Sequence, residues 1–402
     1  MTSIANLLEE SITKKPKIEQ LANSISGYFS TTILVIALLT FVGWYMIGGS
    51  FEEALIVAIS VVVIACPCAL GLATPMSTLV GIGISARDNI LFKEATFLET
   101  MAKSNLLALD KTGTITEGRP SVVEESIVVE FDPSLLYSLL LTSNHPISRG
   151  VATHLESKYE HLSTLELESI KSIESKGITA KYRGLELVGG NGSFMQSIGI
   201  EVDSNSPNSL FLFAIDGKLV VRFELTDTIR DGAKEAISQI KELGVRVVML
   251  TGDHAQSANR VALEVGIDEV YSRLLPQDKA SQIDKFHSRG DIVVMVGDGI
   301  NDTVALSRSD IAIAMGSGAD TAISVSDVVL IDEKPESIYR AYLISRRTFR
   351  AIKENLGFSI LYNVVAIPLA VLGFVNPLIA SLSMSLSSLV VVANSMRIKR
   401  FN

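Results

Sequence analysis

Long uncharged runs of apolar residues lie near both ends of the chain. Residues 28–47 and 54–75 form two such runs of about 20 residues each. Residues 355–396 contain no Asp, Glu, Lys, Arg or His, and a Gly-Phe-Val-Asn-Pro turn at 373–377 divides them. A membrane-spanning helix needs about 20 apolar residues. The pattern therefore predicts four transmembrane helices in two hairpins, one on each side of a long polar middle.

Positive charges flank these runs and predict their orientation. Lys and Arg are enriched in cytoplasmic segments, so we expect all four flanks to be cytoplasmic and the protein to lie in the plasma membrane. The net charge of −9 makes a nucleic-acid partner improbable. The flanking charges are Lys14, Lys15, Lys17, Arg87, Lys93, Arg346, Arg347, Arg350, Lys353, Arg397, Lys399 and Arg400.

The middle of the chain alternates apolar runs with amphipathic segments. Strands are predicted at 244–250, 291–296 and 311–315, and helices at 231–243 and 255–265. Alternation of this kind indicates a parallel sheet whose ligands bind at the carboxyl ends of the strands. Residues 118–223 are richer in strand-like runs, such as 210–215 and 218–221, and indicate a second, α+β domain inserted into the first.

These patterns predict six segments. Residues 1–27 form a cytoplasmic linker, and 28–75 form a transmembrane hairpin. Residues 76–117 and 223–340 form a stalk and the two parts of an α/β domain, with the insertion at 118–222 between them. Residues 341–402 form a second stalk and the C-terminal hairpin.

A polar heptapeptide follows the apolar stretch 106–109. It runs Asp110-Lys111-Thr112-Gly113-Thr114-Ile115-Thr116. A carboxylate at the tip of a strand can attack phosphorus, while backbone N–H groups and hydroxyls of the next loop hold phosphate oxygens. Asp110 is therefore the candidate nucleophile of an aspartyl-phosphate enzyme.

This heptapeptide resembles the phosphorylation signature of the P-type ATPases, whose phosphorylation domain has the haloacid dehalogenase-like fold. Thr251-Gly252-Asp253, Lys279 and the run from Asp298 to Asp302 follow in the order of that family. The resemblance implies that Thr251 and Lys279 contact the phosphoryl group. It implies a Mg²⁺ site of Asp110, the Thr112 carbonyl and Asp298, supported by Asn301 and Asp302, because this ion prefers hard oxygen ligands.

The inserted segment resembles the nucleotide-binding domain of the heavy-metal P-type ATPases. His145-Pro146 matches the His-Pro motif whose histidine contacts the nucleotide in that branch. Gly177 and the pair Gly190-Asn191 match its glycine positions, where missing side chains let ATP approach the backbone. Ser175 and Leu140 depart from the family pattern, which has Gly and Glu at these places.

Cys66-Pro67-Cys68 lies inside the second apolar run. Pro67 lacks an N–H group and breaks a helix, so that both sulfurs can face one site. Two thiolates select soft metals such as Cu(I). Tyr362-Asn363 and Met384 with Ser388 resemble the paired signatures of the copper(I)-exporting branch, and neutral ligands suit a monovalent ion, Cu⁺ or Ag⁺.

The sequence thus predicts ATP-driven copper(I) export, and it leaves alternatives open. These are a zinc or cadmium P-type ATPase fragment, a membrane-anchored haloacid dehalogenase-like phosphatase and a non-enzymatic copper-binding membrane protein. Phosphatases of that kind carry a second Asp where this chain has Thr112. We expect an incomplete pump, because the actuator domain with its Thr-Gly-Glu signature and four helices of the family are missing. Expected partners are an N-terminal half and a copper chaperone.

Overall fold

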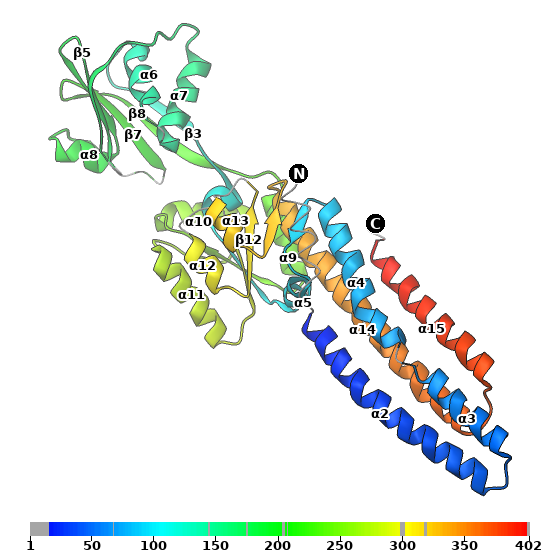
Figure 1. Ribbon diagram of the computed structural model, residues 1–402. Coiled ribbons are helices and arrows are strands. Elements are labelled where there is room, and N and C mark those ends of the chain that lie inside the picture. The colour runs from blue at the N-terminus through cyan, green and yellow to red at the C-terminus, as the bar shows by residue number, and fades with distance from the viewer. Residues whose placement is uncertain are drawn as a thin grey trace. The chain divides into compact units, whose positions relative to one another are not determined.

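A computed structural model describes residues 16–66, 68–143, 145–173, 176–202, 206, 208–297, 302–316 and 320–399 (Figure 1). The chain divides into two compact units. The first comprises residues 1–108, 238–246 and 280–402, and the second comprises 109–237 and 247–279. Four elements continue from one unit into the other. They are β2 (Leu106–Leu109), α9 (Ala233–Glu242), β9 (Arg246–Leu250) and α11 (Pro276–Ser288).

The sheet of the first unit has the order β1-β13-β12-β11. Strands β11 (Val293–Gly297), β12 (Ile311–Met315) and β13 (Val328–Leu330) run parallel, as the sequence predicts, and all their residues are buried. Strand β1 (Ile90–Phe92) pairs antiparallel with β13, so the sheet is mixed rather than purely parallel. Its helices are α5 (Ala95–Lys103), α12 (Thr303–Arg308) and α13 (Asp320–Val325).

Five further helices of the first unit contain the predicted membrane runs. Helices α2 (Lys17–Met46), α14 (Pro335–Val371) and α15 (Pro377–Met396) each contain a segment long and apolar enough to cross a membrane. A 3₁₀ turn, η3 (Arg397–Lys399), follows α15. The helix break that the sequence predicts within the second run is confirmed, because this run is divided between α3 (Phe51–Ile64) and α4 (Cys68–Arg87). Pro67 itself lies outside the described residues.

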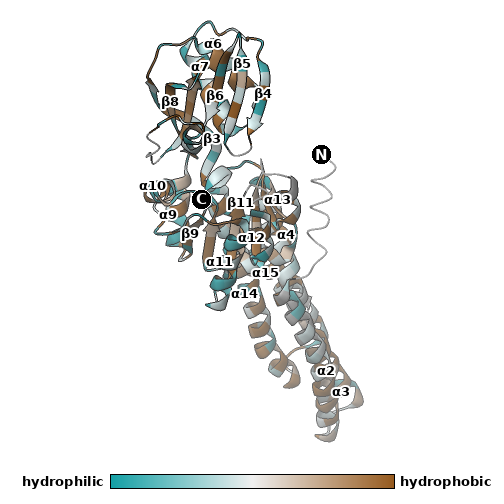
Figure 2. Ribbon diagram, turned by 90° about the vertical axis from the view of Figure 1, so that its left-hand side faces the viewer, coloured by the Kyte–Doolittle hydropathy of each residue, from teal (hydrophilic) through white to brown (hydrophobic). Residues whose placement is uncertain are grey.

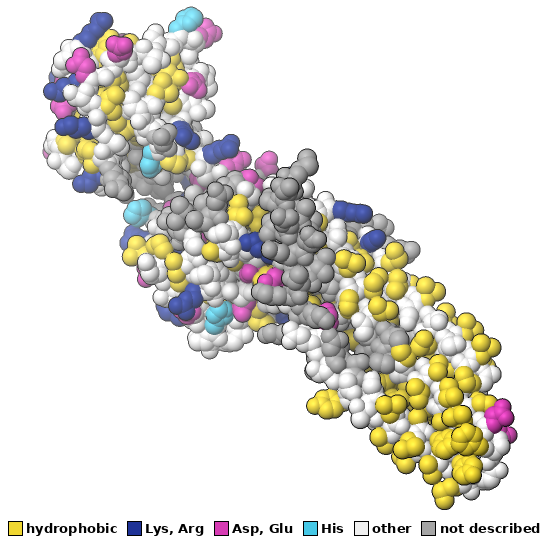
Figure 3. Space-filling model, in the orientation of Figure 1, with side chains coloured by type: hydrophobic (Ala, Val, Ile, Leu, Met, Phe, Trp, Pro, Cys, Tyr) yellow, Lys and Arg dark blue, Asp and Glu magenta, His cyan; other side chains and the backbone are white. Residues whose placement is uncertain are grey.

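The outer surface of these helices is apolar. Figure 2 shows hydrophobic residues along α2, α3 and α14, and Figure 3 shows apolar side chains gathered over this bundle. Leu38, Leu361 and Leu382 are each more than 60% exposed. Exposed apolar surface on this scale marks a region that contacts lipid or another protein.

The second unit holds a six-stranded antiparallel sheet of order β3-β8-β7-β6-β5-β4. Helices α6 (Pro133–Leu141) and α7 (Pro146–Lys158) share a hydrophobic core with it, and α8 (Gly192–Ser197) joins a smaller core. The predicted strands at 210–215 and 218–221 are confirmed. The six strands are β3 (Thr116–Ile127), β4 (Glu168–Ile173), β5 (Gly177–Tyr182), β6 (Leu185–Gly190), β7 (Ser209–Ile215) and β8 (Lys218–Ile229).

The remainder of the second unit carries the polar heptapeptide. The loop η1 (Lys111–Ile115) follows β2 and leads into β3. Strand β9 runs parallel to β10 (Glu269–Tyr271), and α10 (Ala255–Val265) lies between them in sequence. This arrangement places Asp110 and Thr251 directly after the carboxyl ends of β2 and β9.

Candidate phosphorylation, nucleotide and metal sites

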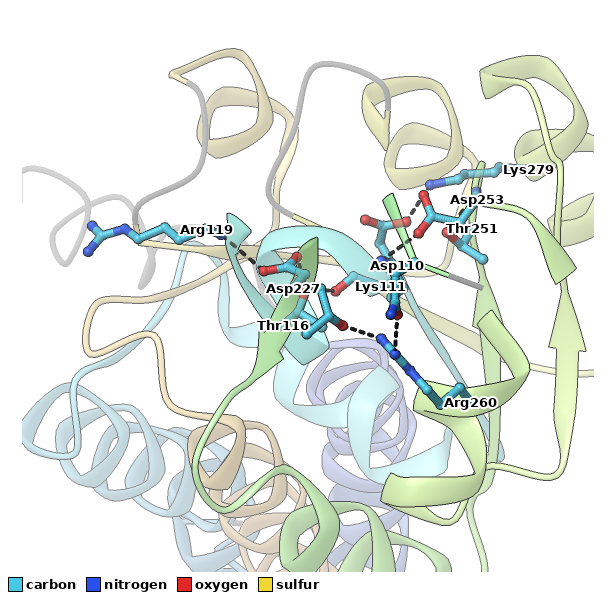
Figure 4. Close-up of polar contacts among 11 residues, drawn as sticks. Asp110, Lys111, Thr116, Arg119, Asp227, Thr251, Asp253, Arg260 and Lys279 are labelled. Atoms are coloured by element: carbon cyan, nitrogen blue, oxygen red, sulfur yellow. Dashed lines mark hydrogen bonds and ion pairs between the residues drawn. The ribbon is translucent and has the colours of Figure 1, made fainter. Parts of the chain in front are cut away.

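Asp110 is buried and held by a lysine. Its side chain is 8% exposed, and the Lys279 Nζ donates a hydrogen bond of 2.5 Å to Asp110 Oδ1 (Figure 4). Lys279 lies in the first turns of α11 and is itself almost fully buried. A buried carboxylate needs a paired positive charge, and the same ammonium group can offset negative charge that develops on a phosphoryl group.

Lys111 and the Thr251-Gly252-Asp253 segment form a second set of contacts beside it. The Lys111 Nζ lies 2.5 Å from Asp253 Oδ2, and the Asp253 N–H donates to Thr251 Oγ1 at 3.2 Å. Thr251 is buried and directly follows β9, whereas Asp253 is partly exposed. The structure therefore brings together residues that are about 140 positions apart in sequence.

Two residues that the sequence analysis missed brace the loop after Asp110. Asp227 of β8 accepts hydrogen bonds from the Thr116 hydroxyl and from the Arg119 N–H, the latter at 3.0 Å (Figure 4). Arg230 donates through Nη2 to the Gly113 carbonyl at 3.0 Å and through Nε to the Thr116 carbonyl at 3.2 Å. Gly113 adopts a φ of 73°, which favours glycine. Thr112 is exposed, and it lies in this loop.

Of the remaining predicted residues of this site, Asp302 belongs to the first unit. Asp302 precedes α12 in the first unit and is 2% exposed. A Cβ on Gly297 would lie 2.9 Å from the Asp302 Oδ2, so the glycine leaves room for that carboxylate. Asp298 and Asn301 lie outside the described residues.

A cavity of about 490 Å³ lies in the inserted part of the second unit. Four of the five predicted nucleotide residues, His145, Gly177, Gly190 and Asn191, line it, together with Lys176 and Phe211. His145 precedes α7 and its Nδ1 accepts the Ile147 N–H at 3.3 Å. Pro146 begins α7 without lining the cavity. Leu140 is buried in the core of α6 instead of facing this cavity, and Ser175 lies outside the described residues.

The two glycines of this cavity have a structural role. Gly177 and Gly190 are cross-strand partners in β5 and β6. A Cβ on Gly177 would lie 2.2 Å from the Gly189 carbonyl oxygen, and one on Gly190 would lie 2.5 Å from the Lys176 carbonyl oxygen. Any larger residue would force these strands apart, so close strand packing requires both glycines.

A second cavity, of about 670 Å³, adjoins the first within the same unit. Ile147, Asn191 and Leu210 line both. The second cavity also contacts Gly252 and Asp253 of the segment after β9. The residues therefore outline a route from the nucleotide cavity towards the segment that holds Lys111.

The proposed copper ligands lie on the membrane helices. Cys66 lies between α3 and α4, and Cys68 begins α4. Cys66 is disulfide-bonded in the structure, so it would have to be reduced before it could serve as a thiolate ligand. On α14, the Tyr362 hydroxyl donates to Ser383 Oγ at 3.1 Å, whereas Asn363 Oδ1 is buried with no hydrogen-bond partner among the described residues. On α15, the Ser388 hydroxyl donates to the Met384 carbonyl at 3.3 Å. Ser383, which the sequence analysis missed, adds a hydroxyl to this region.

Known proteins resemble the chain in sequence. Residues 105–310 match the family of haloacid dehalogenase-like hydrolases. Copper-exporting P-type ATPases of Staphylococcus aureus strains MW2 and Newman are each 40% identical over 414 residues, covering 99% of this chain and 51% of the relative. The chain thus spans about half the length of these relatives.

Solved structures resemble its fold. A zinc-transporting PIB-type ATPase in the E2.Pi state is 27% identical, with a TM-score of 0.80 over 99% of this chain and 67% of the other. The catalytic domain of a CPx-ATPase is 24% identical, covers 65% of this chain and 98% of its own, and shares the fold with a TM-score of 0.57.

The three long apolar helices and these membrane homologues show an integral membrane protein. The match over 105–310 covers the phosphorylation signature and strands β2, β9, β10 and β11, whereas β1, β12 and β13 lie outside it. The chain therefore belongs to the haloacid dehalogenase-like hydrolases and is a homologue of the copper-exporting P-type ATPases.

Proposed function

We propose that this chain couples ATP cleavage to copper(I) export through a phosphorylated Asp110. The Lys279–Asp110 contact carries the proposal, because it places a buried carboxylate and its counter-charge directly after a strand of a haloacid dehalogenase-like fold. Asp110 attacks the γ-phosphorus, the bond to the β,γ-bridging oxygen breaks, and ADP leaves. Lys279 and Lys111 supply positive charge where negative charge develops on the oxygens.

The oxygen donors around Asp110 suit Mg²⁺. The Asp110 carboxylate and the Thr112 carbonyl are hard ligands of the kind this ion prefers, and Asp298 is the proposed third. Bound there, Mg²⁺ would neutralise charge on the transferred phosphoryl group. The Asp253 carboxylate orients Lys111, and the Thr251 hydroxyl contacts the phosphoryl oxygens.

ATP is proposed to bind in the cavity lined by His145, Gly177 and Asn191, with its phosphates directed along the adjoining cavity to Gly252. In this proposal residues 118–222 form the nucleotide-binding domain, and 76–117 with 223–340 form the stalk and phosphorylation domain. Residues 28–75 and 341–402 hold the membrane hairpins and bind the metal in the plasma membrane.

Copper(I) is the proposed cargo because the candidate ligands are soft or neutral. Cys66 and Cys68 offer sulfur, Met384 offers a thioether, and Tyr362, Asn363 and Ser388 offer uncharged oxygens. The 40% identity to copper-exporting relatives favours the same metal. The zinc-transporting structural relative makes Zn²⁺ the alternative to be tested.

Phosphorylation of the purified full chain tests this function. Radiolabelled ATP with Mg²⁺ should give an acid-stable, hydroxylamine-sensitive label on the wild type and none on Asp110→Asn. The exposed Asp231, in the same unit, provides a matched control, since Asp231→Asn should label like the wild type. Equal labelling of wild type and Asp110→Asn would refute Asp110 as the nucleophile.

A further inference from the structure

Four polar side chains meet in the interior of the helical bundle. Asn355 of α14 donates through Nδ2 to Ser77 Oγ of α4 at 3.1 Å and to Ser395 Oγ of α15 at 2.9 Å. The two serine hydroxyls lie 3.0 Å apart, and Asn394 Nδ2 donates to Asn355 Oδ1 at 3.0 Å. Asn355, Ser77 and Ser395 are fully buried. We call these four residues the polar junction.

The polar junction connects the helices that carry the proposed copper ligands. Cys68 begins α4, and Tyr362 with Asn363 lies two turns beyond Asn355 on α14. Met384 and Ser388 precede Ser395 on α15. The Asn355 side chain takes part in three of the four hydrogen bonds of the polar junction, and the fourth joins Ser77 to Ser395. Its amide therefore contributes most to the mutual register of the three helices.

The opposite ends of α4 and α14 are joined through the sheet. Helix α4 ends at Arg87, just before β1, and α14 begins at Pro335, just after β13. These two strands pair, with Ile90 opposite Leu330. The polar junction therefore joins two helices whose other ends are already linked by the pairing of β1 with β13.

Close packing continues along this pair of helices. A Cβ on Gly81 would lie 2.4 Å from Thr348 Oγ1 and 3.0 Å from Thr348 Cγ2. Gly83, two residues further along α4, has open space around it. Gly81 thus marks the contact face one turn from Ser77, and Gly83 provides a matched position off that face.

The individual helices do not depend on the polar junction for their own hydrogen bonds. The Ser77 hydroxyl also donates to the Ala73 carbonyl, and the Ser395 hydroxyl donates to the Val391 carbonyl, each at 2.9 Å. Asn394 has Glu354 as a further acceptor at 3.3 Å. Loss of the Asn355 amide would leave these groups bonded, and the Ser77–Ser395 and Asn394–Glu354 contacts would remain, but three hydrogen bonds between helices would be lost.

We propose that Asn355 is a positioning residue for the metal site: its amide holds α4, α14 and α15 in the register that brings the proposed copper ligands together. This inference rests on the proposed copper transport. It predicts that removal of the amide weakens metal binding while the proposed nucleotide site of the second unit is unaffected.

The test compares metal and nucleotide affinities of the full chain in lipid nanodiscs. Asn355→Leu, of similar volume without the amide, should lower Cu(I) affinity about tenfold in competition with a chromogenic Cu(I) chelator, within the usual range for coupled sites. Its affinity for a fluorescent ATP analogue should equal that of the wild type. Gly81→Ala should weaken Cu(I) binding in the same way, whereas Gly83→Ala should not.

Each outcome decides a separate point. Wild-type Cu(I) affinity in Asn355→Leu would overturn the positioning role. If Asn355→Leu loses ATP-analogue binding and is therefore misfolded, the glycine pair decides, and equal Cu(I) affinities for Gly81→Ala and Gly83→Ala would overturn the role. Absence of Cu(I) binding by the wild type would instead refute the proposed cargo, and the positioning role with it.

Discussion

At the scale of single residues, the site after β2 depends on side chains that hold a loop in place. Asp227 accepts hydrogen bonds from two groups on the segment that follows Asp110, and Arg230 binds two of its carbonyls. The buried Thr116 hydroxyl also has the Lys111 carbonyl as an acceptor at 3.0 Å, so removal of Asp227 would leave that hydroxyl bonded within its own segment and would break its link to β8. The position of the nucleophile is thus linked to β8, about 110 residues later in the chain.

We predict that Asp227→Ala lowers the free energy of unfolding by about 1–3 kcal/mol, because two hydrogen bonds to a carboxylate are lost. It should also reduce the amount of Asp110 phosphoenzyme formed from ATP. Thermal unfolding and radiolabelling of the full chain measure the two effects, with Asp231→Ala as the exposed control. A variant as stable and as readily labelled as the wild type would show that the brace has no effect.

Asn363 presents the opposite case, because its buried Oδ1 has no partner in the described part of the chain. Replacing an unpaired buried acceptor with an apolar group removes a desolvation penalty. We predict that Asn363→Leu keeps or raises the thermal stability and lowers Cu(I) affinity, since a proposed ligand is lost. Chelator competition and thermal unfolding check both parts, and unchanged Cu(I) affinity would exclude Asn363 as a ligand.

At the scale of elements, α7 is tied to β3 by a charged cluster. Glu125 Oε2 lies 2.6 Å from the Lys158 Nζ and 3.0 Å from the His154 Nε2. Burial raises the pKa of Glu125, but hydrogen bonds from Lys158 and His154 outweigh this effect, and the pKa lies below its ordinary value of 4.5. A depressed carboxyl pKa stabilises the folded state above the ordinary value, and this stabilisation is lost as the pH falls through the folded-state pKa.

At pH 7 the backbone amides of β3 and α7 should therefore exchange hydrogen faster in Glu125→Gln than in the wild type. The difference should shrink once the pH drops below 4.5, as Glu125 itself becomes protonated. Lys181→Gln, on the exposed side of β5, serves as the control for a change of charge alone. A difference that is independent of pH would argue against the charged cluster.

Helices and strands with a regular hydrophobic pattern could be predicted from the sequence, whereas the irregular segments between them could not. The runs at 255–265 and 311–315 became α10 and β12 with those same bounds, because each satisfies one repeat throughout. Strand β1 has three residues and an antiparallel partner 240 positions later, so no local pattern reveals it. Asp227 was missed for a similar reason: β8 has two acidic residues, Glu224 and Asp227, and no local pattern shows which of them contacts the loop after Asp110.

At the scale of the whole molecule, the nucleotide cavity and the Asp110 site use different residues. His145, Gly177 and Asn191 line the first, whereas Asp110, Lys279 and Lys111 form the second. Oxygen ligands for Mg²⁺ are proposed only at the second. The proposed binding of nucleotide and the proposed transfer of its phosphoryl group should therefore be separable by experiment.

Chelation of Mg²⁺ should abolish the hydroxylamine-sensitive label, because the metal is needed where charge develops on the phosphoryl group. Binding of a fluorescent ATP analogue should persist, and His145→Ala should weaken it with or without Mg²⁺. His161→Ala, an exposed histidine of the same unit, is the matched control. Loss of analogue binding on chelation alone would show that one metal-dependent site serves both steps.

Helix α14 has 37 residues from Pro335 to Val371. At 1.5 Å per residue it is a rod of about 55 Å, nearly twice the thickness of a bilayer core. Because the helix is this long, a tilt of about 5° at the end next to the sheet would displace its other end by about 5 Å. A small rotation of a strand could thus open or close a passage for an ion, with no rearrangement inside the helix itself.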